Sequence, residues 1–540
     1  MAYNIADLFE HTVDAVGDRV GLIDRDLHLT FADLDARSNR IAHALAARGV
    51  GVGDHVGIYA QNSHEWIEAM YGAFKIRAIP ININFRYVTD ELAYLLGNAD
   101  CVACIFDRQY SDRLEAIRDH TPTLRSLIWI DDGTDGPVGD AESYDEVCAA
   151  ASSERDFDER SGDDIYVLYT GGTTGMPKGV MWRQEDVYMA LGQGIDAVSG
   201  EQVADEWVMS QRAAASPAPL VFLVIPPLMH GAAQWGSMGQ QLQGNTIVLL
   251  PKFSGEAVWE VVEHDGVNSV LITGDAMGRP MIETLIASPH KYDTSSLFAV
   301  SSSAAIFSPT VKDQFLEMFP NLIITDSIGS SEGGFNGIKM VGKGSTQQQG
   351  GPTVIPGPDV AVLDDELNVI SPTSNEVGKL GRTGNIPLGY YKDEKKTAET
   401  FVTAADGNRY AMGGDFAQWE PDGTLTLLGR GSTTINSGGE KIHPEEVEQA
   451  LKDHPAVFDC IVVGVPDDRW GQRVAAVVQF REGHDAALEE LAAHARTFVA
   501  GYKVPREMHV VTEIERSPSG KPDYPWAVTI ARSGDHLRSS

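Results

Sequence analysis

Short apolar runs alternate with amphipathic stretches from about residue 55 to residue 330. The runs have the length and the β-branched character of buried strands, and the stretches between them repeat apolar residues at helical spacing. This alternation predicts α/β layers built on parallel sheets. The predicted strands are 55–60, 78–83, 165–170, 221–225, 246–250, 269–273, 297–301 and 322–326, and the predicted helices include a stretch ending at Lys75, 254–264 and 275–287.

Two helices carry clear end signals. Thr89 is predicted to cap one of them, with Asp90 and Glu91 at the positive end of its dipole and Gly97 as its stop. A second helix is predicted to open at Pro444–Glu446, because proline suits the first helical turn.

The pattern changes near residue 430, where short β-runs, one helix and a final loop replace the regular alternation. We therefore predict a large N-terminal domain over 1–429, with layered α/β subdomains and a β-rich subdomain. A small C-terminal α+β domain is predicted over 430–540. The acidic Gly-, Ser- and Asp-rich segment 132–163 and the segment 342–352 are predicted loops, not linkers between independent domains.

The length of the chain limits the number of domains, and its net charge limits the kinds of partner. At about 150 residues per domain, the 540 residues suggest roughly three to four folded units. Forty-two Lys and Arg against 77 Asp and Glu give a formal net charge of -35. Such a surface repels nucleic acid and anionic lipid, so neither is expected as a partner. Any anionic substrate must be held by local donors.

The four cysteines are too few to cross-link a chain of this size, which favours a reducing compartment and a cytoplasmic location. Cys101 and Cys104 form a C-x-x-C that could be a redox or zinc pair, but they lie in an apolar run and no second pair follows. A buried strand is the preferred interpretation. The start lacks the pattern of a signal peptide, and the longest strongly apolar stretch, 219–229, is too short to span a bilayer.

A glycine- and threonine-rich loop, Tyr169-Thr-Gly-Gly-Thr-Thr-Gly-Met-Pro-Lys-Gly179, follows the predicted strand 165–170. Small residues let backbone N–H groups approach a polyphosphate, and the hydroxyls and Lys178 add donors. It is not the Walker loop, because Lys178 follows proline and precedes glycine. The loop predicts nucleotide binding, with a solvated turn as the alternative. The predicted phosphate ligands are Thr170, Gly171, Gly172, Thr173, Thr174, Gly175 and Lys178.

This loop and a series of later motifs resemble the adenylate-forming superfamily of acyl-CoA synthetases, adenylation domains and luciferases. Each string alone is weak, but their order and spacing over nearly the whole chain are specific. The resemblance implies the fold of that superfamily, with a mobile C-terminal domain. The later motifs are Pro226–Gly231, Gly329–Glu332, Gly378–Phe401, Gly413–Asp415, Gly429–Arg430 with Gly438 and Gly439 beyond, and Ser517–Lys521.

The resemblance also implies ATP, Mg²⁺ and coenzyme A as cofactor and co-substrates. Glu332 would coordinate magnesium, as suits a hard carboxylate oxygen. Asp415 and Arg430 would bind the ribose, and Lys521 would bridge the substrate carboxylate and the α-phosphate. The other implied site residues are Ser302, Ser303, Ala304 and Ser331 for ATP, His230, Gly231, Trp235 and Gly329 for the acyl pocket, Gly438 and Gly439 for the CoA tunnel, and Thr433 for the hinge.

Taken one at a time, these residues have structural alternatives. Glu332 would be a surface carboxylate beside a glycine turn, Asp415 a turn residue and Lys521 a solvated charge. His230 would be a satisfied structural histidine. Small residues after His230 either leave room for a wide acyl tail or allow tight helix packing, and both readings stay open. These small residues are Gly231, Ala232, Ala233, Gly236 and Gly239.

Three positions depart from the superfamily pattern. Ile328 replaces an aromatic residue that packs on adenine, so adenine would be held by apolar contact and by the backbone around 302–305. Thr433 replaces an acidic residue or lysine at the hinge. The segment 522–526 replaces a basic tail, which predicts a last helix that is short or absent.

The substrate and the acceptor follow from what the motifs lack. The segment 226–235 has no acidic residue to pair with an amino acid's ammonium group, so a plain carboxylic acid is expected. Only nineteen residues, 522–540, follow Lys521, which favours free coenzyme A over an attached carrier domain. Several short sequence segments, such as 326–332 and 520–524, resemble the corresponding segments of actinobacterial fatty-acid and steroid-side-chain CoA synthetases.

The sequence is compatible with two other functions: an acyl-AMP ligase that loads a separate carrier protein, and a catalytically silent nucleotide-binding homologue. The oligomeric state is also open, with a homodimer among the options.

Overall fold

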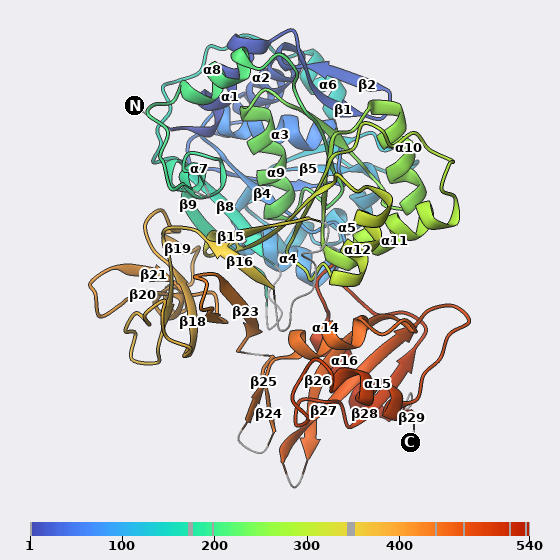
Figure 1. Cartoon of the computed structure of the whole chain (residues 1–540). Coiled ribbons are helices and arrows are strands. Elements are labelled where there is room, and N and C mark those ends of the chain that lie inside the picture. Colours follow the sequence, from blue (N-terminus) through green and yellow to red (C-terminus); the bar gives the residue numbers. More distant parts are fainter. Residues whose placement is uncertain are drawn as a thin grey trace. The chain divides into compact units, whose positions relative to one another are not determined.

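Figure 1 shows the computed structural model of the chain. The chain divides into two compact units, each made of several segments. The first unit comprises 1–271, 288–297 and 385–399, and the second comprises 272–287, 298–384 and 400–540. The predicted domain boundary between residues 429 and 430 is a different division and stays a prediction. The described residues are 3–170, 176–196, 199–342, 352–431, 433–437, 440–467, 470–517, 520–534 and 537–538.

One sheet of the first unit is wholly parallel, as the alternating pattern predicts. Both cysteines of the C-x-x-C are buried, unbridged residues of its strand β5, which confirms the buried-strand interpretation. Its strands, in spatial order, are β4 (Ile79–Asn82), β3 (His55–Tyr59), β5 (Cys101–Asp107), β6 (Ser126–Ile130) and β7 (Glu142–Ser143).

A second set of strands in this unit has the order β2, β1, β11, β10, β12, and only the pair β1–β2 is antiparallel among the pairs described. The predicted strands 221–225, 246–250 and 269–273 are therefore confirmed to within one residue. The bounds are β1 (Val20–Asp24), β2 (Leu27–Thr30), β10 (Val221–Val224), β11 (Thr246–Leu249) and β12 (Ser269–Ile272).

A small antiparallel sheet completes the first unit and departs from the parallel expectation. It consists of β8 (Ile165–Thr170), β9 (Lys178–Arg183) and β19 (Gly389–Tyr390). Strands β8 and β9 form a hairpin, which needs only a short connection, whereas a parallel pair would need a long crossover.

Helices cover the parallel strands of the first unit. Helix α4 begins at Thr89 with Val88 as its cap residue, so the predicted cap at Thr89 is wrong by one position, although Glu91 still bonds back to the Val88 N–H. The helices are α1 (Ile5–Val16), α2 (Phe31–Ala47), α3 (His64–Lys75), α4 (Thr89–Asn98), α5 (Ser111–Ala116), α6 (Tyr144–Ala149), α7 (Gln184–Leu191), α8 (Val208–Ala215), α9 (Gly231–Leu242), α10 (Gly255–Asp265) and α13 (Glu394–Thr400), with 3-10 turns at Arg108–Tyr110 and Arg118–His120.

The second unit starts with the parallel pair β13–β14, and the strands that follow pair antiparallel into the predicted β-rich region. Two helices, α11 (Gly274–Ala287) and α12 (Pro309–Met318), belong to the same unit. The strands are β13 (Ala299–Ser303), β14 (Ile323–Ser330), β15 (Gly334–Val341), β16 (Thr353–Pro356), β17 (Val360–Leu363), β18 (Val377–Arg382), β20 (Phe401–Thr403), β21 (Arg409–Ala411), β22 (Asp415–Trp419) and β23 (Leu425–Arg430).

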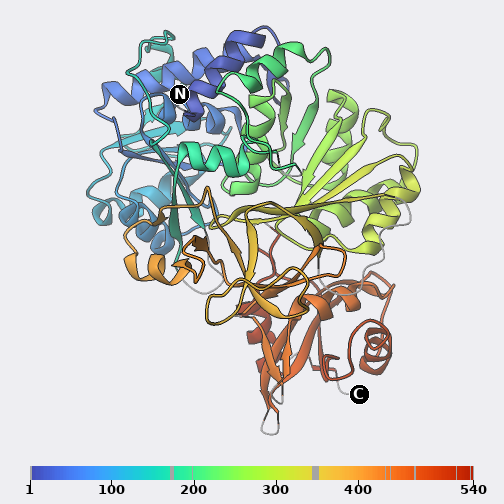
Figure 2. The ribbon, with the colours of Figure 1, turned by 60° about the vertical axis from the view of Figure 1, so that its left-hand side comes forward.

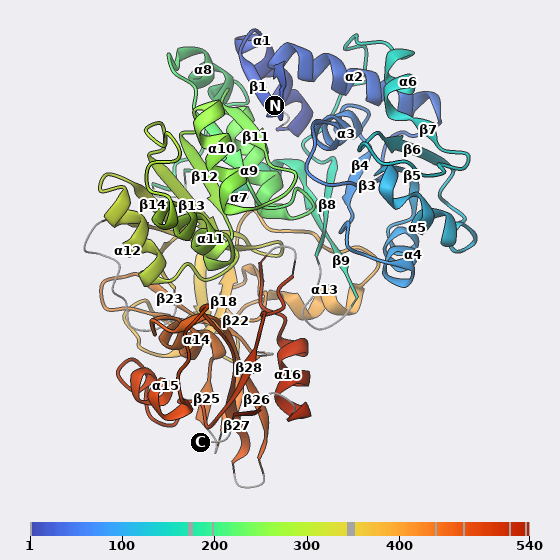
Figure 3. The same ribbon diagram turned by 90° about the vertical axis from the view of Figure 1, so that its right-hand side faces the viewer.

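The C-terminal segment forms the expected α+β arrangement around the long antiparallel pair β26–β27 (Figure 2). Residues of β26 alternate between the two faces of the sheet. Val462 packs with α14 and α15, whereas Ile461 and Val463 pack with α16 on the other face (Figure 3). The elements are β24 (Ile435–Ser437), β25 (Glu440–Ile442), α14 (Pro444–Lys452), β26 (Val457–Asp467), β27 (Gly471–Phe480), α15 (Leu488–Ala495), β28 (Glu507–Val511), α16 (Tyr524–Ser533) and β29 (Leu537–Arg538).

The last helix, α16, has ten residues, which corrects the expectation that it would be short or absent. Asp523 caps it by accepting the Trp526 N–H at 3.0 Å, and its buried Ala527 and Ala531 pack against the sheet. A cap and a buried face stabilise the helix without the basic tail that the sequence lacks. Among the residues that the structure describes, no helix is both long and apolar enough to cross a membrane.

Candidate active site

The residues that flank the predicted phosphate loop lie at the loop end of the β8–β9 hairpin. Thr170 and Lys178 are register partners there, and the loop residues 171–175 lie outside the described part of the chain. The Lys178 ammonium forms an ion pair with Asp393, which follows β19. Its hydrogen bond to Lys178 holds the pKa of Asp393 below the usual value. The pair holds the loop's cation at the loop end of the hairpin.

Asp393 was not predicted from the sequence. It accepts the Lys396 N–H at 2.9 Å at the start of α13, and strand β19, just before it, pairs with β9. An aspartate just before a helix is a recognisable capping residue in a sequence. The ion pair of Asp393 with Lys178, 215 residues away, is not recognisable, because no local pattern connects the two segments.

The serines predicted to contact ATP lie at the end of β13. The Ser302 hydroxyl accepts the Gly274 N–H at 3.2 Å, and its carbonyl accepts the Ser327 hydroxyl at 3.2 Å. Ala304, directly after the strand, has a positive φ of 68°, a conformation that costs energy for any residue with a Cβ. The backbone here is therefore held in an unusual turn by its neighbours.

Glu332 lies in the tight turn between β14 and β15 and is partly buried. The Ser330 hydroxyl accepts the Gly333 N–H at 2.9 Å, and Arg382 donates to the Gly333 carbonyl at 3.1 Å. A Cβ on Gly329 would lie 2.6 Å from the Gly334 carbonyl oxygen, so only glycine fits there. The turn around Glu332 and its neighbour Ser331 is thus closely constrained.

Ile328 precedes this turn and packs against the apolar cluster of the β-rich region, which includes Val354, Leu380 and Leu425. Where the superfamily has an aromatic residue that packs on adenine, this chain has an aliphatic residue that packs against the protein's own apolar cluster. The isoleucine side chain contributes to the apolar cluster of the β-rich region.

Asp415 and Arg430 are direct register partners in the antiparallel pair β22–β23. Fifteen residues apart in sequence, they are adjacent across the ladder. A Cβ placed on Gly413 would lie 3.6 Å from Asp415 Oδ2 and 3.7 Å from Ser330 Oγ, so this strand end and the β14–β15 turn are close. The side chain of Arg430 lies outside the described part of the chain.

Lys521 is exposed and lies in a hydrogen-bonded loop before α16. Its N–H donates to Ser517 Oγ at 3.1 Å, and its carbonyl accepts the Ser517 N–H at 2.8 Å. Gly520, with φ of 76°, faces the start of α11, where an added Cβ would meet Thr273 and Ala276 at 3.1 and 3.2 Å. The Lys521 loop thus lies against the N-terminal turn of α11.

The predicted acyl-pocket residues His230, Gly231 and Trp235 begin α9, with His230 as its cap residue. A Cβ on Gly231 would lie 2.5 Å from Leu168, and one on Gly236 would lie 2.8 Å from Leu271. Two of the small residues therefore permit close packing, which is the second of the alternatives that the sequence left open. Trp235 is buried, edge-on to the Tyr166 ring at 5.7 Å.

The predicted hinge residue Thr433 follows a segment tied to the β-rich region, because Gly431 donates to the Gly414 carbonyl at 3.0 Å. Gly429, with φ of 94°, packs against the Glu445 carboxylate so closely that a Cβ would clash with it. Glu445 was not singled out from the sequence. Gly438 and Gly439, predicted for the CoA tunnel, lie outside the described residues.

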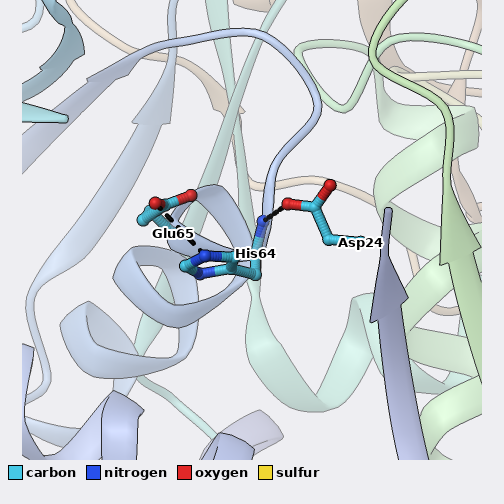
Figure 4. A group of neighbouring side chains, drawn as sticks. All are labelled: Asp24, His64 and Glu65. Atoms are coloured by element: carbon cyan, nitrogen blue, oxygen red, sulfur yellow. Dashed lines mark hydrogen bonds and ion pairs between the residues drawn. The ribbon is translucent and has the colours of Figure 1, made fainter. Parts of the chain in front are cut away.

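A carboxylate–histidine group lies apart from the predicted residues: Asp24, His64 and Glu65 offer ligand atoms within 4.8 Å of one another (Figure 4). Asp24 accepts the His64 N–H at 3.0 Å at the start of α3. The His64 ring contacts Glu68 at 2.9 Å and Glu65 at 3.3 Å. These bonds join the end of β1 to the start of α3, which gives the group a structural role.

Comparison with known proteins shows the family of the chain. The model of the AMP-binding enzyme family matches residues 9–391, and that of the AMP-binding enzyme C-terminal domain matches residues 446–521. A 3-oxocholest-4-en-26-oate--CoA ligase of Rhodococcus rhodochrous is 53% identical over 534 residues, which cover 98% of this chain and 96% of that protein. A medium/long-chain-fatty-acid--CoA/3-oxocholest-4-en-26-oate--CoA ligase of Mycolicibacterium smegmatis is 51% identical, with 100% and 99% covered.

Solved structures share the fold at low sequence identity. The anthranilate CoA ligase AuaEII in complex with anthranoyl-AMP superposes with a TM-score of 0.85 at 22% identity, covering 99% of this chain and 98% of that one. ATP-bound MatB from Rhodopseudomonas palustris gives 0.81 at 21% identity, with 99% of both chains covered. The α/β fold with its smaller C-terminal domain is thereby confirmed, and with the family matches over most of its length the chain belongs to the family of AMP-binding enzymes.

Proposed function

We propose that this chain is an AMP-forming acyl-CoA synthetase. In the first half-reaction a carboxylate oxygen of the acid attacks the α-phosphorus of ATP and pyrophosphate leaves, giving an acyl-adenylate. In the second, the thiol sulfur of coenzyme A attacks the acyl carbon and AMP leaves. The observation that carries the proposal is the full-length identity of 51 to 53% to relatives named CoA ligases.

Fatty acids and steroid side-chain acids are the proposed substrates. The relatives' names specify 3-oxocholest-4-en-26-oate and medium- to long-chain fatty acids. The start of the predicted acyl segment supports a substrate without an amino group, since 226–235 contains no acidic residue. Trp235 and the surrounding buried apolar side chains suit an apolar tail.

The predicted residues receive chemically distinct roles. Lys178 would bind phosphate oxygens of ATP, exchanging its ion pair with Asp393 for a more highly charged partner. Asp415 would accept both ribose hydroxyls. Lys521 would offset the repulsion between the two anions that must meet in the first half-reaction.

Magnesium fits the donor chemistry at Glu332, a partly buried carboxylate held in a constrained turn beside serine hydroxyls. When bound there, the ion would neutralise phosphate charge. The protein's own contribution is to hold that carboxylate in place through Ser330, Gly333 and Arg382.

The direct test is a panel of fatty, aryl and steroid acids, assayed for ATP-dependent pyrophosphate release with and without coenzyme A. We expect pyrophosphate release with fatty and steroid side-chain acids, and AMP release that requires coenzyme A. AMP release that is independent of coenzyme A and requires a carrier protein would show an acyl-AMP ligase instead. No pyrophosphate release with any acid would refute enzymatic turnover.

Substitution of Lys521 separates the two half-reactions. In Lys521→Ala, the rate of acyl-adenylate formation should fall by a factor on the order of 10² to 10³, because a preorganised donor to developing negative charge is lost. Conversion of synthetic acyl-adenylate with coenzyme A should stay close to wild type. Lys395→Ala, at an exposed lysine of α13, is the matched control. Equal impairment of both half-reactions would contradict a role confined to the first.

A further inference from the structure

We propose that one face of α11, formed by Asp275, Arg279 and Glu283, is a docking surface for the C-terminal domain, residues 430–540, and that it positions Lys521. The three residues follow one another at intervals of four, so they lie along one side of the helix with alternating charge. Helix, domain and lysine all belong to the second unit. The catalytic consequence rests on the proposed function.

At the C-terminal end of the surface, Glu283 forms an ion pair with Arg481, which directly follows β27. Both side chains are partly exposed, at 34% and 22%. The Arg481 guanidinium also lies 6.0 Å from the centre of the Phe458 ring. A partly exposed pair of this kind contributes modestly and can separate readily.

At the N-terminal end, the Lys521 loop reaches the first turn of α11 through Gly520. Helix α12 adds one contact beside the surface, since the Thr310 hydroxyl donates to Asp453 at 2.6 Å. The C-terminal domain is thus held at both ends of α11 and at α12, and the approach of Lys521 to Thr273 and Ala276 is a geometric consequence of that docking.

Arg279, in the middle of the surface, opposes tight docking. It is 1% exposed and lies 5.8 Å from the Phe458 ring, and one of its nitrogens donates to Asp275 at 3.1 Å. Its Nε and Nη1 have no hydrogen-bond partner. Buried donors without partners are unfavourable, and they would regain water if the domain moved away. One surface therefore combines a stabilising ion pair with a group that favours release.

The sharpest test reverses the charges of the ion pair. Glu283→Arg and Arg481→Glu should each slow acyl-adenylate formation by about three- to tenfold, the range expected for a partly exposed pair converted to repulsion. Conversion of synthetic acyl-adenylate with coenzyme A should stay within twofold of wild type. The double variant Glu283→Arg/Arg481→Glu should restore the first half-reaction, since the attraction is re-formed with opposite sign.

Absence of rescue in the double variant, or equal loss in both half-reactions, would overturn the proposal. Thermal unfolding of each variant separates loss of docking from loss of folding. Arg279→Met, which removes the unpaired donors, should have the opposite effect and slow the coenzyme A step. Arg279→Lys, which keeps the charge beside Asp275, is its matched control. A faster or unchanged coenzyme A step in Arg279→Met would refute the role of Arg279 in release.

A measurement without catalysis keeps the two proposals distinguishable. In Thr310→Cys/Asp453→Cys protein, a short bis-maleimide should cross-link the two positions, and Glu283→Arg should reduce the yield. If the wild type has no ligase activity but the yield falls in this way, the proposed function fails and the docking surface stands. An unchanged yield would refute docking even if the enzyme is active.

Discussion

The charged network around Lys75 in the first unit and the Glu283–Arg481 pair in the second are built from the same residue types but differ in burial. Lys75 is fully buried and pairs with Glu10 and Asp35, joining α1, α2 and α3. Arg155 and Arg160 extend this network to the segment before β8. Glu283 and Arg481 form one partly exposed pair.

Burial decides what each can do. A charge inside the protein is costly unless its partners remain in place, so the network around Lys75 can only be a permanent part of the fold. A pair near water loses little when it opens, because water replaces the partner. The first unit is thus fastened by its charges, whereas the docking surface on α11 can engage and release.

The largest effect should follow from breaking the buried network. Lys75→Met should lower the free energy of unfolding by about 3 to 5 kcal/mol, because Glu10 and Asp35 would keep their buried charges and lose the fully buried cation between them, with Arg160 and Arg155 as their remaining partners. Urea or thermal unfolding measures this, with Lys395→Ala as the control at an exposed lysine. A loss below about 1 kcal/mol would mean that the network is not structural.

A smaller effect is expected at Glu445, a partly buried residue of the second unit whose buried Oε2 has no hydrogen-bond partner. Burial, the neighbouring Glu448 and then Asp415 raise its pKa to about 8 from the ordinary 4.5. The folded state therefore binds a proton that the unfolded state has lost. This stability is fully present below the unfolded pKa and is lost as pH rises through about 8.

Glu445→Gln should remove this dependence, since glutamine does not titrate. Between pH 6 and 8 the wild type should lose about 2 kcal/mol more unfolding free energy than the variant, at roughly 1.4 kcal/mol per unit of pKa difference. Urea unfolding at both pH values gives the comparison. Parallel pH profiles would show that Glu445 is ionised in the folded protein.

The smallest effect should come from neutralising the exposed pair. Glu283→Gln should change the free energy of unfolding by about 1 kcal/mol or less, far less than Lys75→Met. The two variants measured side by side sharpen the contrast between a permanent and a reversible contact. A cost as large as that of Lys75→Met would make the Glu283–Arg481 pair part of the fixed fold and exclude release.

Local pattern was sufficient for many elements and for the motifs. Strand β8 has the predicted bounds, and β10 and β11 end one residue early, because an apolar run between turn residues specifies a buried strand without reference to the rest of the chain. Cap and end signals were less reliable. The helix expected to start after Thr89 begins at that residue, and α16 exists although its sequence argued against it.

The sequence by itself determined the family and the α/β alternation, and it proposed which side chains bear the chemistry, since these depend on residue type and on order along the chain. Only the tertiary structure decided that Lys178 pairs with Asp393, that Asp415 and Arg430 are register partners and that Gly231 accommodates Leu168. It also showed that Glu283 meets Arg481, 198 residues away. Such pairs arise when distant segments pack together, and the energy of a contact across the fold leaves no periodic trace in either segment.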